Sequence, residues 1–283
     1  MRCAALWSGF EGTGTRRDGR PQACPERSRR VQAKHRSGRL SVSVSGKVAI
    51  IAALEREVSA FVKDWPSTVR EHDGCSFKFF EKEGNAVVCG GVGAQAARRA
   101  TEAAINLYHP SLVISAGFAG ALDPALAVGH TLVPRHVIDA SDASRTDAGA
   151  GEGVLITFDS VADVEQKARF ATAFGAHAID MEAAAVARSA QAHRVKFLAC
   201  KVISDSSNSA LPPLTPFICR DGRFQFFRFV LHMALRPWRW AALRRLARDS
   251  AKAAQSLGVV LEKHTTWAAP EEDLSHTAVD QGR

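Results

Sequence analysis

Three mostly apolar runs, at residues 48–54, 112–116 and 197–203, most constrain the fold of this chain. Each run is about one strand long, and strands that are covered on both faces of a sheet are apolar throughout. Alanine-rich segments with a helical pattern lie between them. Because strands and helices alternate, we expect an α/β protein with a mostly parallel sheet and right-handed crossovers.

The rest of the chain supplies weaker patterns of the same kind. We expect a hairpin from residues 77–80 and 86–89, and a bent strand at 128–138. Small residues at 117–122 and glycines at 139–153 predict loops. The remaining expected elements are strands at 154–158 and 176–180 and helices at 94–107, 163–174, 224–235 and 240–261, with further helices that open at residue 55 and just after Asp180.

The positive charge of the chain is concentrated at its beginning. Residues 1–46 hold ten Lys or Arg and three acids, a net charge of +7, while the other 237 residues carry +1. This leader has no hydrophobic period, which predicts a disordered basic segment or a mis-called start. A nucleic-acid arm is the alternative for the leader, but the nearly neutral remainder does not favour a nucleic-acid partner. Residues 47–264 form the expected catalytic domain, and 265–283 a flexible tail.

Cysteine and histidine spacing predicts neither a disulfide framework nor a metal site. The six cysteines include no CxxC pair, and three of them lie in or near apolar stretches. Reduced thiols of this kind are typical of cytoplasmic proteins. No run of about 18 uncharged apolar residues is present, so we expect no membrane-spanning segment.

Three carboxylates follow predicted strands, which places them at the carboxyl edge of the sheet, where ligands bind. They are Glu57, Glu182 and Asp205. Each alone is more typical of a solvated acid or a helix cap, and Asp180 is placed as such a cap. Together they fit the breaking of a glycosidic bond, which needs an acid for the leaving group and a base for the nucleophile.

A glycine-rich turn, residues 90–93, enters the helix expected at 94–107. The backbone N–H groups at such a helix start, Gly93 among them, can bind an anion or a ribose. A plain tight turn is an equally good interpretation of this motif alone.

Four motifs in order, at residues 52–58, 115–122, 179–183 and 202–205, resemble those of the nucleoside phosphorylase/nucleosidase superfamily. The general pattern is similar to that of methylthioadenosine/adenosylhomocysteine nucleosidases. The resemblance implies a three-layer α/β/α sandwich around a mixed, mostly parallel central sheet. It implies an enzyme that usually forms homodimers or larger oligomers and needs no metal or organic cofactor.

The resemblance also implies a role for each matching residue. Asp205 would protonate the purine N7, with Ser204 placing its carboxylate. Glu182 would bind the ribose hydroxyls with Met181 against the sugar, and Glu57 would activate water. The other implied substrate-binding residues are Gly93, Gly117, Phe118, Ala119, Gly120 and Phe158, although a phenylalanine in a buried strand is more often core.

Residues after the last motif are similar to the hopanoid-associated branch of the superfamily, which removes adenine from adenosylhopane. The similar stretches are 210–213, 220–222 and 243–249. A methylthioadenosine/adenosylhomocysteine nucleosidase is the first alternative, and a non-catalytic nucleoside- or lipid-binding protein the second. Residues 55–58 occupy the place of the phosphate loop of many phosphorylases, which favours water as nucleophile. Inorganic phosphate stays open as a co-substrate.

The segment 220–248 combines eight arginines with phenylalanines and tryptophans. One interpretation is a terminal helix pair on the sheet, with its arginines in water. The other is an interfacial surface that meets the inner face of the cytoplasmic membrane, as a lipid-linked substrate would require. The residues assigned to this contact are Phe226, Phe227, Phe229, Trp238, Trp240, Arg228, Arg236, Arg239 and Arg244.

Overall fold

The computed structural model describes residues 46–209 and 240–265, together with residues 215–217, 219, 222, 224, 225, 228, 229 and 232. The helix expected at 224–235 falls largely outside these residues. The helix expected at 240–261 is present as α6 (Trp240–Thr265).

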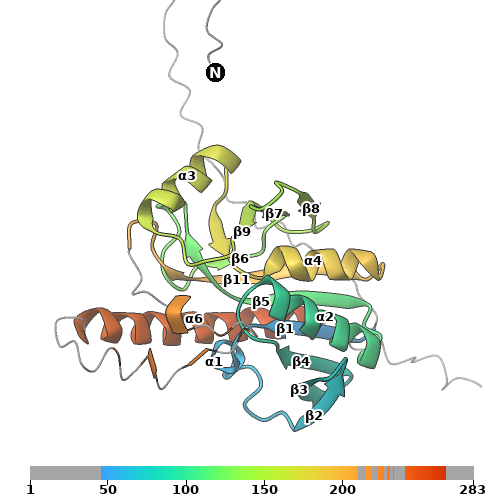
Figure 1. Ribbon diagram of the computed structural model, residues 1–283. Coiled ribbons are helices and arrows are strands. Elements are labelled where there is room, and N and C mark those ends of the chain that lie inside the picture. Colours follow the sequence, from blue (N-terminus) through green and yellow to red (C-terminus); the bar gives the residue numbers. More distant parts are fainter. Residues whose placement is uncertain are drawn as a thin grey trace, which may run out of the picture. The chain divides into compact units, whose positions relative to one another are not determined.

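One mixed sheet runs through the described residues (Figure 1). The order of hydrogen-bonded neighbours in the sheet is β2-β3-β4-β1-β5-β10-β9-β7-β8. In addition, β11 pairs with β5 and with β6. The strands are β1 (Val48–Ala52), β2 (Ser67–His72), β3 (Cys75–Lys82), β4 (Asn85–Cys89), β5 (Leu112–Ala121), β6 (Thr131–Leu132), β7 (His136–Asp139), β8 (Arg145–Asp147), β9 (Val154–Thr157), β10 (Ala178–Asp180) and β11 (Lys196–Asp205).

Strand β5 is the centre of the sheet because it has three partners. Its first half pairs in parallel with β1, and its last residues pair antiparallel with β10. β11 runs parallel along its other edge. The strand partner of β5 therefore changes between Ser115 and Gly120. The chain segments that follow β1 and β10 meet at this change of partner.

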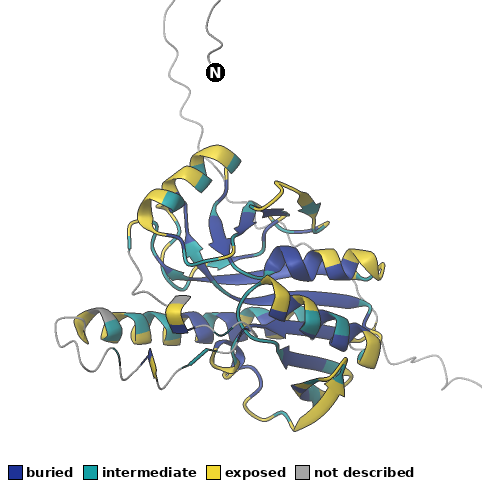
Figure 2. Ribbon diagram, viewed as in Figure 1, coloured by how far each residue is buried: buried dark blue, intermediate teal, exposed yellow. Residues whose placement is uncertain are grey.

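Helices cover both faces of the sheet, so the predicted three-layer α/β/α sandwich is confirmed. α2 (Ala94–Tyr108) and α4 (Ala183–Ala192) share one hydrophobic cluster with one face of the sheet. α1 (Glu55–Val58) and α6 share a second cluster with the other face. Figure 2 shows buried central strands between helices whose outer faces are exposed.

α3 (Val164–Phe174) lies beside β9 and β10, where it packs in a third hydrophobic cluster. Asp163 caps its start by accepting a hydrogen bond from Gln166 N–H, and the Gln166 side chain accepts one from Asp163 N–H. This reciprocal capping box satisfies two otherwise unpaired backbone donors. Gly175 ends the helix in the left-handed conformation. The caps fix the start and end of α3 and hence the direction of Lys167.

The loop predicted at residues 117–122 is wrong, because most of it is the second half of β5. Its small residues remain extended since β11 and β10 pair with them on both edges. The loop predicted at 139–153 contains the short strand β8. The bent strand predicted at 128–138 is two strands, separated around Pro134, which has no backbone N–H for a sheet. β2 was not predicted because its residues are mostly exposed and polar.

Candidate active site

A cavity of about 160 Å³ lies where the partner of β5 changes, and we call it the site cavity. The ends of β1, β5, β10 and β11 all contribute to its wall. The predicted residues that line it are Glu57, Phe118, Ala119, Gly120, Met181, Glu182, Ser204 and Asp205. The structure thus brings together carboxylates that lie up to 148 positions apart in the sequence, at 57, 182 and 205.

Glu57 is held rigidly in the first turn of α1. Its side chain is 6% exposed, and its Oε2 accepts a hydrogen bond from Leu54 N–H at 3.1 Å. Burial raises the pKa of the Glu57 carboxyl, while this hydrogen bond and the charge of Lys201 act in the opposite direction. A raised pKa makes a carboxylate a stronger base, which suits the removal of a proton from water.

Gly117 allows β5 to pass close to Glu57. Its φ of +150° is one that other residues rarely adopt, and a Cβ there would lie 3.2 Å from Glu57 Oε2. The same Cβ would lie 3.7 Å from Lys201 Nζ. Gly117 does not line the site cavity. Because it has no side chain, it leaves room for the Glu57 carboxylate and the Lys201 ammonium.

Glu182 lies at the start of α4 and lines the site cavity. Its Oε1 accepts a hydrogen bond from Gly93 N–H at 2.9 Å, which joins the glycine turn to the carboxylate. Burial of its carboxyl group and the nearby charge of Asp180 raise the pKa of Glu182 to about 7. Met181 is half-buried beside it and lines the site cavity.

Lys201 is a charged residue that the sequence patterns did not single out. Its Nζ lies 2.8 Å from Asp180 Oδ2, and both side chains are almost completely buried. Burial by itself would lower the pKa of Lys201, but the charges of Asp180 and Glu182 raise it. Lys201 therefore offsets the negative charge of Asp180, Glu182 and Glu57. A lysine inside an apolar strand was the available signal, because a buried lysine needs a partner.

Asp180 fixes the geometry around Lys201. It accepts hydrogen bonds from Thr157 Oγ1 at 2.6 Å and from Ala183 N–H at 2.9 Å. The second bond satisfies a backbone donor at the start of α4, the capping role predicted for Asp180. Its oxygens thus have three polar partners, which compensates for the burial of its charge.

Asp205 lies at the end of β11 and faces Gly120 across the sheet. A Cβ on Gly120 would lie 3.0 Å from Asp205 Oδ2, so a larger residue there would require the carboxylate to shift. A register shift between Ile203 and Asp205 interrupts the alternation of side chains along β11. This irregularity brings Ser204 Oγ within 2.8 Å of Asp205 Oδ1, to which it donates a hydrogen bond.

Three predicted substrate-binding residues do not line the site cavity. Gly93 and Gly117 lie beside the carboxylates of Glu182 and Glu57, whereas Phe158 lies elsewhere. It packs against Phe170 in the cluster around α3, with ring centroids 5.0 Å apart, and it does not line the site cavity. Phe118 is half-buried and lines the site cavity. Phe224 also lines it, together with Leu246 of α6.

The Arg/aromatic segment is only partly described. Phe229 is 4% exposed and contacts Phe217 and Phe224, which corrects the prediction that it meets a membrane. Trp240, Arg228 and Arg244 are exposed, as that contact requires. Phe226, Phe227, Trp238, Arg236 and Arg239 lie outside the described residues. Among the helices that the structure describes, none is long and apolar enough to cross a membrane.

Fold and site together define a class of protein, an α/β enzyme with several carboxylates around a small cavity. Burial raises the pKa of the Glu57 carboxyl, and the Asp205 carboxylate accepts a hydrogen bond from the Ser204 hydroxyl. Such a pair supplies the acid and the base that acid–base catalysis on a small molecule needs.

Comparison with known proteins identifies the family. The model of the phosphorylase superfamily matches residues 47–156 and 141–215, which together cover more than half of the chain. The chain belongs to the phosphorylase superfamily. It is an enzyme of the nucleosidase or nucleoside phosphorylase type, as the four motifs predicted.

The chain is similar to the 5′-methylthioadenosine/S-adenosylhomocysteine nucleosidase of Staphylococcus haemolyticus, with 28% identity over 57% of this chain and 87% of the relative. Its fold resembles a nucleosidase of that name from Colwellia psychrerythraea, solved with adenine, at a TM-score of 0.52 and 24% identity over 58% and 84% of the two chains. It also resembles the futalosine hydrolase of Helicobacter pylori, with a TM-score of 0.59 and 18% identity over 78% and 97%.

Proposed function

We propose that the protein cleaves the N-glycosidic bond of an adenine nucleoside. The convergence of Glu57, Glu182 and Asp205 on one cavity is the observation that carries this proposal. Glu182 binds the ribose hydroxyls and Asp205, oriented by Ser204, meets the purine. Glu57 lines the same cavity and takes a proton from the attacking water. The bond then breaks through an oxocarbenium-like state between the two carboxylates.

Water is the proposed nucleophile. The position after β1 is filled by Glu57 and its hydrogen bond to Leu54 N–H, an arrangement that supplies a base. A phosphate group would bring further negative charge next to the Glu57 and Glu182 carboxylates, which like-charge repulsion disfavours. No metal or organic cofactor is assigned a role in this mechanism.

The proposed substrate carries an apolar 5′ substituent, as adenosylhopane does. The apolar side chains of Leu54, Val92, Phe224 and Leu246 line one side of the site cavity and fit such a group. The second candidate is methylthioadenosine or adenosylhomocysteine, favoured by the similarity to nucleosidases of that name. Both substrates keep the same roles for the three carboxylates.

A product assay with and without added phosphate tests the reaction. Adenosine, methylthioadenosine and adenosylhopane are incubated with the full chain, and the free base and sugar products are measured. We expect free adenine without phosphate, fastest from adenosylhopane. Strict dependence on phosphate with a ribose 1-phosphate product would contradict the hydrolytic mechanism.

The nearly isosteric Asp205→Asn is expected to lower kcat by about 10²-fold or more, the scale of general acid catalysis.

Contact with the cytoplasmic face of the membrane is proposed for the segment 220–248, in which Arg228, Trp240 and Arg244 are the assigned residues that the structure describes as exposed. A shortened chain without residues 1–46 is expected to bind anionic liposomes and to release them at high salt. Removal of the leader is the necessary control, because that leader carries most of the net charge.

Homo-oligomerisation is a separate proposal, which the mass of the protein in solution tests.

A further inference from the structure

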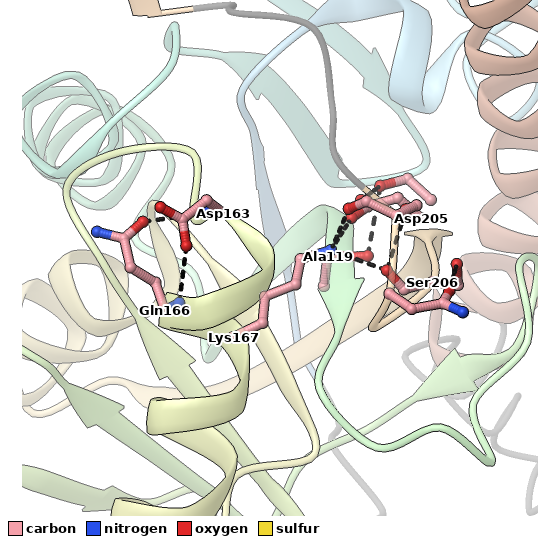
Figure 3. Close-up of polar contacts among 9 residues, drawn as sticks. Ala119, Asp163, Gln166, Lys167, Asp205 and Ser206 are labelled. Carbon is pink, nitrogen blue, oxygen red and sulfur yellow. Dashed lines mark hydrogen bonds and ion pairs between the residues drawn. The ribbon is translucent and has the colours of Figure 1, made fainter.

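Lys167 is a second buried lysine of the site, and nothing in the sequence patterns pointed to it. It extends from α3 to the site cavity, where its Nζ lies 2.5 Å from Asp205 Oδ2 (Figure 3). The Lys167 side chain is 3% exposed and that of Asp205 is 6% exposed. Lys167 therefore forms a buried ion pair with the residue that is proposed to act on the purine.

The three donors of the Lys167 ammonium all have partners. Besides Asp205, they point to the backbone oxygens of Ser206 at 2.9 Å and Ser209 at 3.4 Å. The other oxygen of Asp205 accepts the hydrogen bond from Ser204. The pair is fully hydrogen-bonded, which is the condition for keeping two charges buried.

This geometry changes how Asp205 can act as an acid. The carboxylate of an ion pair holds no proton of its own, whereas a leaving purine needs one. The ammonium of Lys167 is the buried proton carrier in direct contact with it. A carboxylate between an ammonium and the substrate can receive a proton on one side and pass it on at the other.

We propose that Lys167 is the source of the proton that the leaving base receives through Asp205; this inference rests on the proposed function. Lys167 Nζ gives a proton to Asp205, and Asp205 gives it to the purine N7 as the bond between C1′ and N9 breaks. The electron pair of that bond stays on the purine, which leaves as a neutral base. Water adds to C1′ and loses its proton to Glu57. Solvent then returns a proton to Lys167 and removes one from Glu57, so the net reaction is hydrolysis.

Two substitutions separate proton supply from charge. Lys167→Arg keeps a cation and its donors, but a guanidinium does not give up its proton in proteins. Lys167→Met removes the cation and the proton together. Each variant is assayed on adenosine and on nitrophenyl riboside, whose leaving group departs without protonation. We expect both variants to lose about 10²-fold or more in kcat on adenosine. On nitrophenyl riboside, Lys167→Arg is expected to stay close to wild type.

The same assay can overturn the proposal. If Lys167→Arg releases adenine at the wild-type rate, the residue only holds the carboxylate. If Lys167→Arg slows both substrates equally, its role is structural. Circular dichroism confirms that each variant is folded before its rate is interpreted.

A direct measurement keeps this inference separate from the proposed function. The carbon-13 signal of the Asp205 carboxyl, assigned by its loss in Asp205→Asn, reports whether that group carries a proton in the free enzyme. We expect an ionised carboxylate at neutral pH in the wild type. A protonated Asp205 would overturn the proposed proton source even if the enzyme releases adenine, while failure to release adenine with an ionised Asp205 would contradict the proposed function and, with it, the proton transfer that rests on it.

Discussion

At the scale of single residues, the site depends on close contacts between like and unlike charges. Lys201 lies among Asp180, Glu182 and Glu57, and Lys167 pairs with Asp205. Removal of one partner would leave a buried charge without compensation, which is strongly destabilising. The lysines therefore explain how several carboxylates can share a small cavity in a folded protein.

Gly117→Ala is expected to abolish most of the activity. The added Cβ would lie 3.2 Å from Glu57 Oε2, on a backbone whose φ is +150°, so the carboxylate must move. Gly149→Ala is the matched control, because Gly149 also has a positive φ but has open space around it. Both variants should lose about 1–3 kcal/mol of unfolding free energy from backbone strain. Equal kcat in the two variants would show that Gly117 does not position Glu57.

The pH dependence of stability should report Glu182. Its pKa is raised to about 7 in the folded protein, from an ordinary value of 4.5. Between these values the folded state binds more protons than the unfolded state, so the contribution of Glu182 to stability falls as the pH rises. Unfolding free energies of the wild type and Glu182→Gln are measured from pH 5 to pH 8. We expect the wild type to lose stability relative to Glu182→Gln up to about pH 7, and a constant difference would contradict the assignment.

At the scale of elements, α6 closes one face of the sheet and reaches the site cavity. Its residues Ala253, Leu257 and Leu261 are buried in the cluster shared with β1 and β11, whereas Leu246 lines the site cavity nearer its start. The same helix thus contributes both core and active-site wall. The amphipathic pattern of residues 240–261 was sufficient to predict the helix but not which sheet face it covers.

Leu257→Ala is expected to lower the unfolding free energy by about 2–5 kcal/mol, because it leaves a cavity in the core. Leu257 is fully buried, whereas Val259 on the same helix is 54% exposed. Val259→Ala is therefore the control, with an expected change of about 0.5 kcal/mol or less. Denaturant unfolding of both variants measures the difference. Similar losses in the two would mean that α6 does not pack on the sheet in solution.

At the scale of the whole molecule, charge and core are separated along the chain. The first described strand, β1, starts at Val48, and the match to the superfamily starts at residue 47. Most of the net charge lies before that point. Solubility and non-specific binding are therefore expected to depend on residues 1–46, and stability on the rest.

Removal of residues 1–45 tests this division. The shortened chain is expected to keep the melting temperature and the activity of the full chain, because the described core contacts begin after that point. Its binding to heparin should weaken sharply, since it loses a net charge of +7. A melting temperature lower by several degrees would show that the leader contributes to the folded core.

The sequence by itself determined the α/β class, most strands and helices, and the three carboxylates at strand ends. These features depend on local periodicity and on the order of elements, both of which are written along the chain. Residues such as Glu57 and Asp205 could be predicted because strand ends of a parallel sheet meet at one edge.

Only the tertiary structure decided how these residues are paired. The partners of Lys167 and Lys201 lie 38 and 21 positions away in the sequence, on other elements. The change of partner along β5, which opens the site cavity, turned an expected loop into a strand. These long-range ion pairs depend on which surfaces are buried when the helices pack on the sheet. A buried charge is stable only beside its partner. A pattern of residues along the chain does not show which buried charges become neighbours after folding.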